Sequence, residues 1–124
     1  MNVLFDAIFT RWTAAMGGRT LYNTEGDDEA SFPYSTVTIV GNTPDWTFTE
    51  DFEDILIQFN LFSETPAMTE VGTTFEALKV AFDFHALAIT GYETVSLVRG
   101  NANLTRVDKK WQYIVTYRIQ IQAD

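Results

Sequence analysis

The sequence of 124 residues contains no cysteine, one histidine and three prolines. The absence of cysteine excludes disulfides, thiolate metal sites and cysteine nucleophiles, so the fold must depend on burial of apolar side chains. A Ser-His-Asp triad could be built only around His85, and no Gly-x-Ser-x-Gly motif is present to hold a nucleophile. Because His85 lies at the end of a predicted helix, we interpret it as a helix-terminus residue. The sequence therefore predicts no catalytic residue, no enzymatic activity and no cofactor.

Long hydrophobic runs are also missing. The longest apolar stretches are interrupted by polar residues and fall far short of the roughly 20 residues that a membrane span needs. The first residues lead into an amphipathic segment with an early Asp6, unlike a basic, apolar signal peptide. We therefore expect synthesis in the cytoplasm and no membrane partner.

Basic residues are scarce, since 8 Lys and Arg stand against 17 Asp and Glu and give a net charge of −9. This charge disfavours sequence-independent binding to a phosphate backbone. The charge is also unevenly placed: residues 19–86 carry two basic and thirteen acidic side chains, net −11, whereas residues 87–124 carry five basic and three acidic ones, net +2. The asymmetry predicts two electrostatically different surfaces on one molecule.

Two clusters of carboxylates are the only candidates for a divalent cation site, Asp27-Asp28-Glu29 and Glu50-Asp51-x-Glu53-Asp54. Neither matches an EF-hand loop, and adjacent residues on a strand point to opposite faces instead of converging on an ion. We interpret both clusters as solvated acidic surface and predict no metal site.

Apolar material is abundant, with 46% hydrophobic and 15% aromatic residues. Together with the length, this predicts a single domain over residues 1–124. Residues 3–16 have the spacing of an amphipathic helix that stops at Gly17-Gly18, and a second apolar stripe from Met68 to Phe82 predicts another helix, which ends near Thr90-Gly91. The residues predicted to be largely buried are Trp12, Phe59, Phe75, Leu78, Phe82 and Tyr113.

Alternating apolar and polar residues predict strands over residues 34–40, 46–62 and 111–122, with a looser strand or pair of strands over 95–107. Turn residues at 41–45 and 107–110 separate these segments. We expect the arm from Thr43 to Glu53 and the loop from Asn23 to Ala30 to become ordered at contacts with other subunits. The order helix, strands, helix, strands predicts an α+β fold, a mainly antiparallel sheet with two helices packed on one face.

This order of elements resembles the tail-terminator (tail-completion) proteins of long-tailed bacteriophages. The most recognisable pieces are the strand entry Phe32-Pro33-Tyr34 and the strand that ends in Gln58-Phe59-Asn60-Leu61-Phe62-Ser63 before a helix. Such proteins form rings, typically hexamers, that cap the tail tube, end its polymerisation and provide the surface for head attachment. The resemblance implies a virion protein at the head-proximal end of the tail. Its partners would be other copies of itself, the tail tube protein and a head-completion or connector protein, with DNA only passing through the ring lumen.

The charge asymmetry gives such a ring a physical rationale, because an acidic surface of one copy could face a more basic surface of the next. The candidate residues of this protomer or tube interface are Asp27, Asp28, Glu29, Glu50, Asp51, Arg99, Arg106, Lys109, Lys110 and Arg118. Two alternative functions stay open. One is a head-tail connector or neck subunit, and the other is a small-ligand-binding α+β protein with a cavity between sheet and helices.

Overall fold

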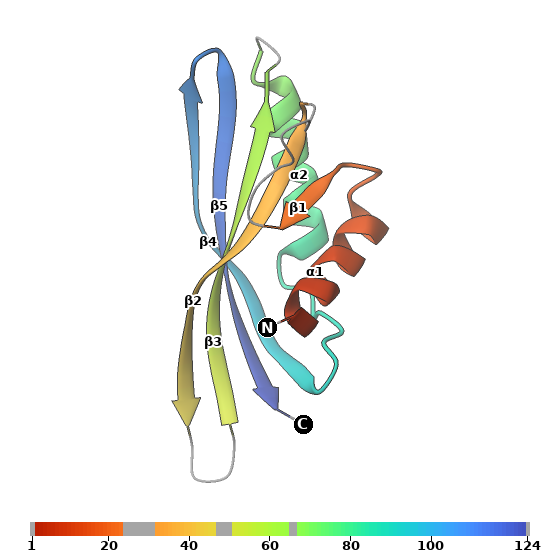
Figure 1. Ribbon diagram of the computed structural model, residues 1–124, viewed down its shortest axis with the longest axis vertical. Helices are drawn as coiled ribbons and strands as arrows, with labels where there is room; N and C mark the ends of the chain where they lie inside the picture. The colour runs from red at the N-terminus through yellow and green to blue at the C-terminus, as the bar shows by residue number, and fades with distance from the viewer. Residues whose placement is uncertain (1, 24–31, 47–50, 65–66, 124) are drawn as a thin grey trace.

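Two helices pack on one face of a curled five-stranded sheet in the computed structural model, which describes residues 2–23, 32–46, 51–64 and 67–123 (Figure 1). The elements are α1 (Asn2–Ala15), β1 (Leu21–Asn23), β2 (Tyr34–Trp46), β3 (Asp51–Ser63), α2 (Thr69–Phe82), β4 (Tyr92–Val107) and β5 (Lys110–Ala123). The strand order is β1-β2-β3-β5-β4, and every neighbouring pair except β1 with β2 is antiparallel. The predicted α+β fold is confirmed.

A predicted helix end and a predicted hairpin turn are confirmed by their backbone conformations. Gly17 and Gly18 have φ angles of 64° and 83°, and they end α1 in the left-handed region that glycine adopts without steric cost. Asp108 and Lys109 connect β4 to β5 with φ angles of 51° and 64°. Positive φ at both central residues is the requirement of a type I′ turn, whose twist matches that of the strands it joins.

The end of α2 differs from the prediction, because the helix stops at Phe82 and does not continue toward Thr90-Gly91. Phe84 has a φ angle of 60°, and residues 85–89 have no regular structure. Leu87 and Ile89 nevertheless remain buried. The hydrophobic pattern thus continues past the helix, because the irregular segment after it also packs on the core. For this reason the pattern predicted an end of α2 that lies too far along the chain.

The predicted turn at residues 41–45 was wrong, because these residues continue β2. The strand pairs with β3 as far as Trp46 opposite Asp51, with one shift in register between Ile39 and Gly41. Pro44 is tolerated because β1 pairs with β2 only over Ser35–Val37, which leaves this part of β2 an edge among the described strands. The β2–β3 hairpin extends beyond the helices as the predicted arm (Figure 1), whereas residues 24–30 and 47–50 lie outside the described residues.

The core lies between the helices and the sheet, with a group of aromatic rings at its centre. Phe59 is fully buried, and its ring centroid lies 5.9 Å from that of Trp12, 5.1 Å from that of Phe82 and 5.8 Å from that of Tyr117. The indole N–H of Trp12 donates a hydrogen bond to the carbonyl oxygen of Arg19 at 2.6 Å. This group ties both helices to the centre of the sheet.

Of the six residues predicted to be largely buried, Trp12, Phe59, Leu78 and Phe82 have almost no exposed surface. Phe75 and Tyr113 are partly exposed but pack against this core, which agrees with the prediction that they are largely buried. Their rings stack on each other with centroids 4.2 Å apart at the margin of the core. They lie where α2 approaches the hairpin of β4 and β5, so one side of the pair stays open to solvent.

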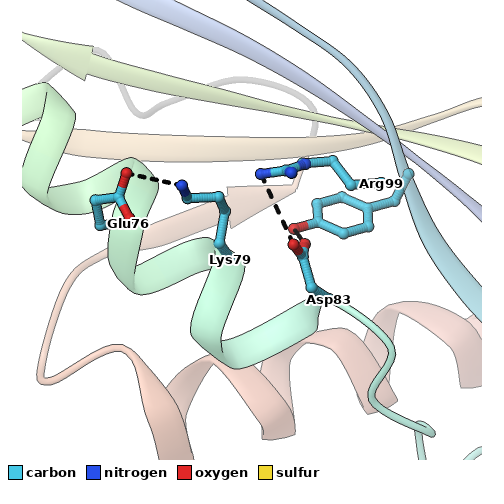
Figure 2. Close-up of polar contacts among 5 residues, drawn as sticks. Glu76, Lys79, Asp83 and Arg99 are labelled. Atoms are coloured by element: carbon cyan, nitrogen blue, oxygen red, sulfur yellow. Dashed lines mark hydrogen bonds and ion pairs between the residues drawn. The ribbon is translucent and has the colours of Figure 1, made fainter.

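A polar cluster attaches the end of α2 to the sheet (Figure 2). Tyr117 of β5, which has no exposed surface, donates its phenol O–H to a carboxylate oxygen of Asp83, the residue after α2. Arg99 of β4 lies 3.7 Å from the other oxygen of that carboxylate. Burial, followed by the hydrogen bond to Asp83 and the negative charge of Asp83, raises the pKa of the Tyr117 phenol far above its ordinary value. The cluster therefore favours a neutral phenol and an anchored helix end.

Candidate interaction surface

The sheet face that carries no helix has an uncharged polar centre. Along β2, β3 and β5, every second side chain is buried under the helices, and the side chains between them point to the helix-free face. Pairing brings these three strands side by side. The polar residues of this centre, which we call the polar ladder, are Thr36, Thr38, Gln58, Asn60, Gln112 and Thr116. All except the buried Thr36 are half-buried, although no helix covers them.

The side chain of Asn60 forms hydrogen bonds with polar-ladder residues of β2, β3 and β5. Its side-chain oxygen accepts from the amide of Gln58 at 3.1 Å and from that of Gln112 at 3.2 Å, while its own amide nitrogen donates to the hydroxyl of Thr36 at 3.3 Å. These bonds fix the orientation of the amides, so the ladder presents a defined pattern of donors and acceptors. Such a surface can contact another protein without burying a charge.

An aromatic cluster lies at one end of the same face. Tyr34 is at its centre, with its ring centroid 5.8 Å from that of Tyr22, 5.1 Å from that of Phe32 and 4.9 Å from that of Phe62. The ammonium nitrogen of Lys110 lies 5.2 Å from the centroid of the Phe32 ring. The Phe32-Pro33-Tyr34 segment thus supplies two of the four half-buried rings, which lie outside the main core.

A cleft of about 290 Å³ opens beside the aromatic cluster. It is lined by the aromatic residues Phe32, Tyr34, Phe62 and Trp111, and by polar residues at the β4–β5 turn that include Lys110. A cavity of about 150 Å³ is sufficient to hold benzene. The cleft, which we call the aromatic cleft, is therefore large enough for the ring of an aromatic side chain.

The basic candidate residues lie in three places. Arg106, Lys109 and Lys110 gather at the β4–β5 hairpin, where the guanidinium of Arg106 lies 4.6 Å from the ring centroid of Trp111. Arg99 is half-buried beside the polar cluster of α2, whereas Arg118 is exposed on the helix-free face of β5. The structure thus brings together only the three hairpin residues.

The acidic candidates lie mostly beyond the described residues. Asp27, Asp28, Glu29 and Glu50 are outside them, and Asp51 is described only as the first residue of β3, opposite Trp46. Their part in an interface stays a prediction. Sequence reasoning missed the polar ladder and the aromatic cleft, although the neutral amides and hydroxyls at alternate positions of β3 and β5 were a visible signal.

Other kinds of site find little support in the described part of the chain. No group of three or more His, Cys, Asp or Glu residues there is arranged to hold a metal ion. No helix there is long and apolar enough to cross a membrane.

No model of a known protein family matches the sequence, and no curated protein matches it either. The fold is similar to that of a chain in the virion of a native gene transfer agent particle, with a TM-score of 0.78 and 13% sequence identity over 95% of this chain and 93% of that chain. A second solved structure has a TM-score of 0.64 and 12% identity over 99% of this chain and 94% of that chain. At these identities the comparisons establish a shared fold over nearly the whole of each chain.

Proposed function

We propose that this protein is a non-enzymatic virion subunit of a tailed bacteriophage that forms a ring on the head-proximal end of the tail tube. The ring would end tube polymerisation and offer the surface to which the head attaches. The observation that carries the proposal is the fold likeness to a chain of a gene transfer agent virion, with a TM-score of 0.78 over 95% of this chain. The resemblance of the Phe32-Pro33-Tyr34 entry and of β3 to tail terminators points to the same role.

The helix-free sheet face supports an assembly role. The centres of protein interfaces are depleted of charged residues and enriched in aromatic ones. The polar ladder contains no charged side chain in a protein of net charge −9, and the aromatic cluster adjoins it. This combination fits a surface that another protein covers, either a second copy, the tail tube protein or the head-completion or connector protein.

The basic hairpin supports contacts between unlike surfaces. Arg106, Lys109 and Lys110 project from a chain whose first two thirds are strongly acidic. Opposite charges on the two sides of a head-to-tail contact speed encounter and fix orientation, although each exposed pair contributes only about 0 to 1 kcal/mol. Apolar and polar-ladder contacts must then provide most of the binding free energy.

Native mass spectrometry and negative-stain electron microscopy of the full chain test the proposal directly. We expect a closed ring of one stoichiometry, six copies in the hexameric case. When added to the polymerising tail tube protein of the same genome, the ring should bind one tube end and stop growth there. A chain that stays monomeric at all concentrations and leaves tube length unchanged would contradict the proposal. A ring that binds the head connector but no tube end would instead identify a neck subunit.

A further inference from the structure

A pocket of about 290 Å³ lies where the connection from α1 to β1 passes the start of β2. Phe62 near the end of β3 and Thr74 of α2 complete its lining, and all of its lining residues belong to the described part of the chain. A cavity of about 150 Å³ is sufficient to hold benzene. The pocket, which we call the Arg19 pocket after its one charged lining residue, is therefore large enough for a small organic ligand.

The guanidinium of Arg19 is half-buried and has no counter-ion. One of its nitrogens donates to the carbonyl oxygen of Met16 at 2.7 Å, which uses only one of its several N–H donors. No carboxylate of the described residues forms an ion pair with Arg19, although residues 19–86 carry thirteen acidic side chains. The remaining donors can therefore bind an anion that enters the pocket.

A buried serine lines the same pocket. Ser35 is only 2% exposed, and its backbone N–H donates to the carbonyl oxygen of Thr20 at 3.0 Å. Its hydroxyl, in contrast, forms no hydrogen bond with another residue that the structure describes. Because buried polar groups nearly always have a partner, this hydroxyl is a second donor that a ligand in the Arg19 pocket would satisfy.

The lining favours a single negative charge on an apolar body. A guanidinium binds a carboxylate through two parallel hydrogen bonds, whereas a phosphate carries more charge and is commonly bound by clusters of arginines. The rings of Tyr34 and Phe62 supply apolar walls. The carboxylate of Glu70, one turn before Thr74 on α2, accepts a hydrogen bond from the Ser63 hydroxyl at 2.6 Å and does not line the pocket. The Arg19 pocket thus has no negative group of its own in its lining.

We propose that the Arg19 pocket binds a carboxylate attached to a small apolar body, with the guanidinium of Arg19 and the hydroxyl of Ser35 as its polar contacts. Two sources present this chemistry, a free aromatic acid and the C-terminal carboxylate of a peptide. The proposal goes beyond the proposed function and does not depend on a ring.

Calorimetric titration of the full chain with benzoate tests the proposal, and benzamide is the uncharged control of almost the same shape. We expect saturable binding of benzoate and binding of benzamide that is at least about 10-fold weaker, the effect of losing a charge-assisted hydrogen bond. Inorganic phosphate should also bind more weakly than benzoate. Equal affinity for benzoate and benzamide, tighter binding of phosphate, or no saturable binding of any carboxylate probe would overturn the proposal.

Two variants assign the binding to this pocket. Arg19→Gln should raise the dissociation constant for benzoate at least about 10-fold. Its matched control is Arg118→Gln, which removes an exposed guanidinium from the helix-free face and should leave binding unchanged. Ser35→Ala should weaken binding about 3- to 10-fold without lowering the thermal midpoint, because the hydroxyl has no partner among the described residues to lose. Unchanged benzoate affinity in either pocket variant would overturn the proposal, and Ser35→Ala alone decides it if Arg19→Gln does not fold.

A short peptide distinguishes the two sources of the carboxylate. The tripeptide alanyl-alanyl-phenylalanine is titrated once with a free C-terminal carboxylate and once as its C-terminal amide. Tighter binding of the free-acid peptide than of benzoate would identify a chain terminus as the occupant, whereas weaker binding would identify a free small acid. If the amide binds as tightly as the free-acid peptide, the carboxylate contact is wrong.

Discussion

Replacing Phe59 by alanine is expected to lower the free energy of unfolding by about 3 to 5 kcal/mol. Phe59 has no exposed surface. Its ring packs against Trp12 of α1, Phe82 of α2 and Tyr117 of β5. Domains have about 5 to 15 kcal/mol of stability in total, so the variant should lose a large fraction of its stability. The midpoint and slope of urea unfolding measure the loss.

The same change at two other phenylalanines provides the controls. Phe75→Ala should cost less than Phe59→Ala, because Phe75 is half-buried against Tyr113. Phe84→Ala should leave monomer stability nearly unchanged, because that ring is 81% exposed. A loss below about 1 kcal/mol for Phe59→Ala would show that the centre of the core lies elsewhere.

Replacing Asp83 by alanine is expected to cost about 2 to 3 kcal/mol. The change removes the acceptor of the Tyr117 phenol and leaves a buried hydroxyl unpaired. The loss of the partly exposed pair with Arg99, at 3.7 Å, should add little. Tyr117→Phe should cost less, because the only group that loses its partner is the Asp83 carboxylate, which is partly exposed and stays near Arg99. In the double variant the two losses should not add, since both remove the same hydrogen bond.

The same pair predicts a dependence on pH. Because burial and Asp83 raise the pKa of Tyr117 in the folded state, the stabilisation is fully present below the unfolded pKa of about 10 and is lost as pH rises above it. The slope contributed by one phenol is about 1.4 kcal/mol per pH unit. Tyr117→Phe should therefore lose stability less steeply above pH 10 than the wild type. If stability falls equally steeply with pH in the two proteins, the pKa of Tyr117 is the same in the folded and the unfolded state.

Patterns that depend on neighbours in sequence predicted most of the fold. The periodicity of residues 3–16 and the alternation in β3 and β5 reflect which face of one element is buried. The turn at 107–110 depends on the backbone conformation of its own residues. The turn residues at 41–45 misled the prediction, because pairing with β3 holds them in a strand. Cross-strand hydrogen bonds and an edge position for Pro44 overrode the local preference for a turn.

The candidate surface was harder to predict because it depends on register. Asn60 bonds to Thr36 and Gln112, which lie 24 and 52 residues away in the sequence. No local pattern shows that these three side chains meet. Charge summed along the chain likewise cannot tell which face of a strand a residue occupies, so Arg99 and Arg118 were grouped with the hairpin lysines although they lie apart from them.

The pairing of β3 with β5, a contact that we call the seam, determines how the subunit folds. The chain consists of two similar halves, α1 with the β2–β3 hairpin and α2 with the β4–β5 hairpin, which meet along this seam. Helices of 14 residues and isolated hairpins are only marginally stable in water, and Phe59 finds Phe82 and Tyr117 only across the two halves. Unfolding should therefore be all-or-none, with equal calorimetric and van't Hoff enthalpies. During translation, neither half can form the polar ladder by itself, because that surface needs β2, β3 and β5 together.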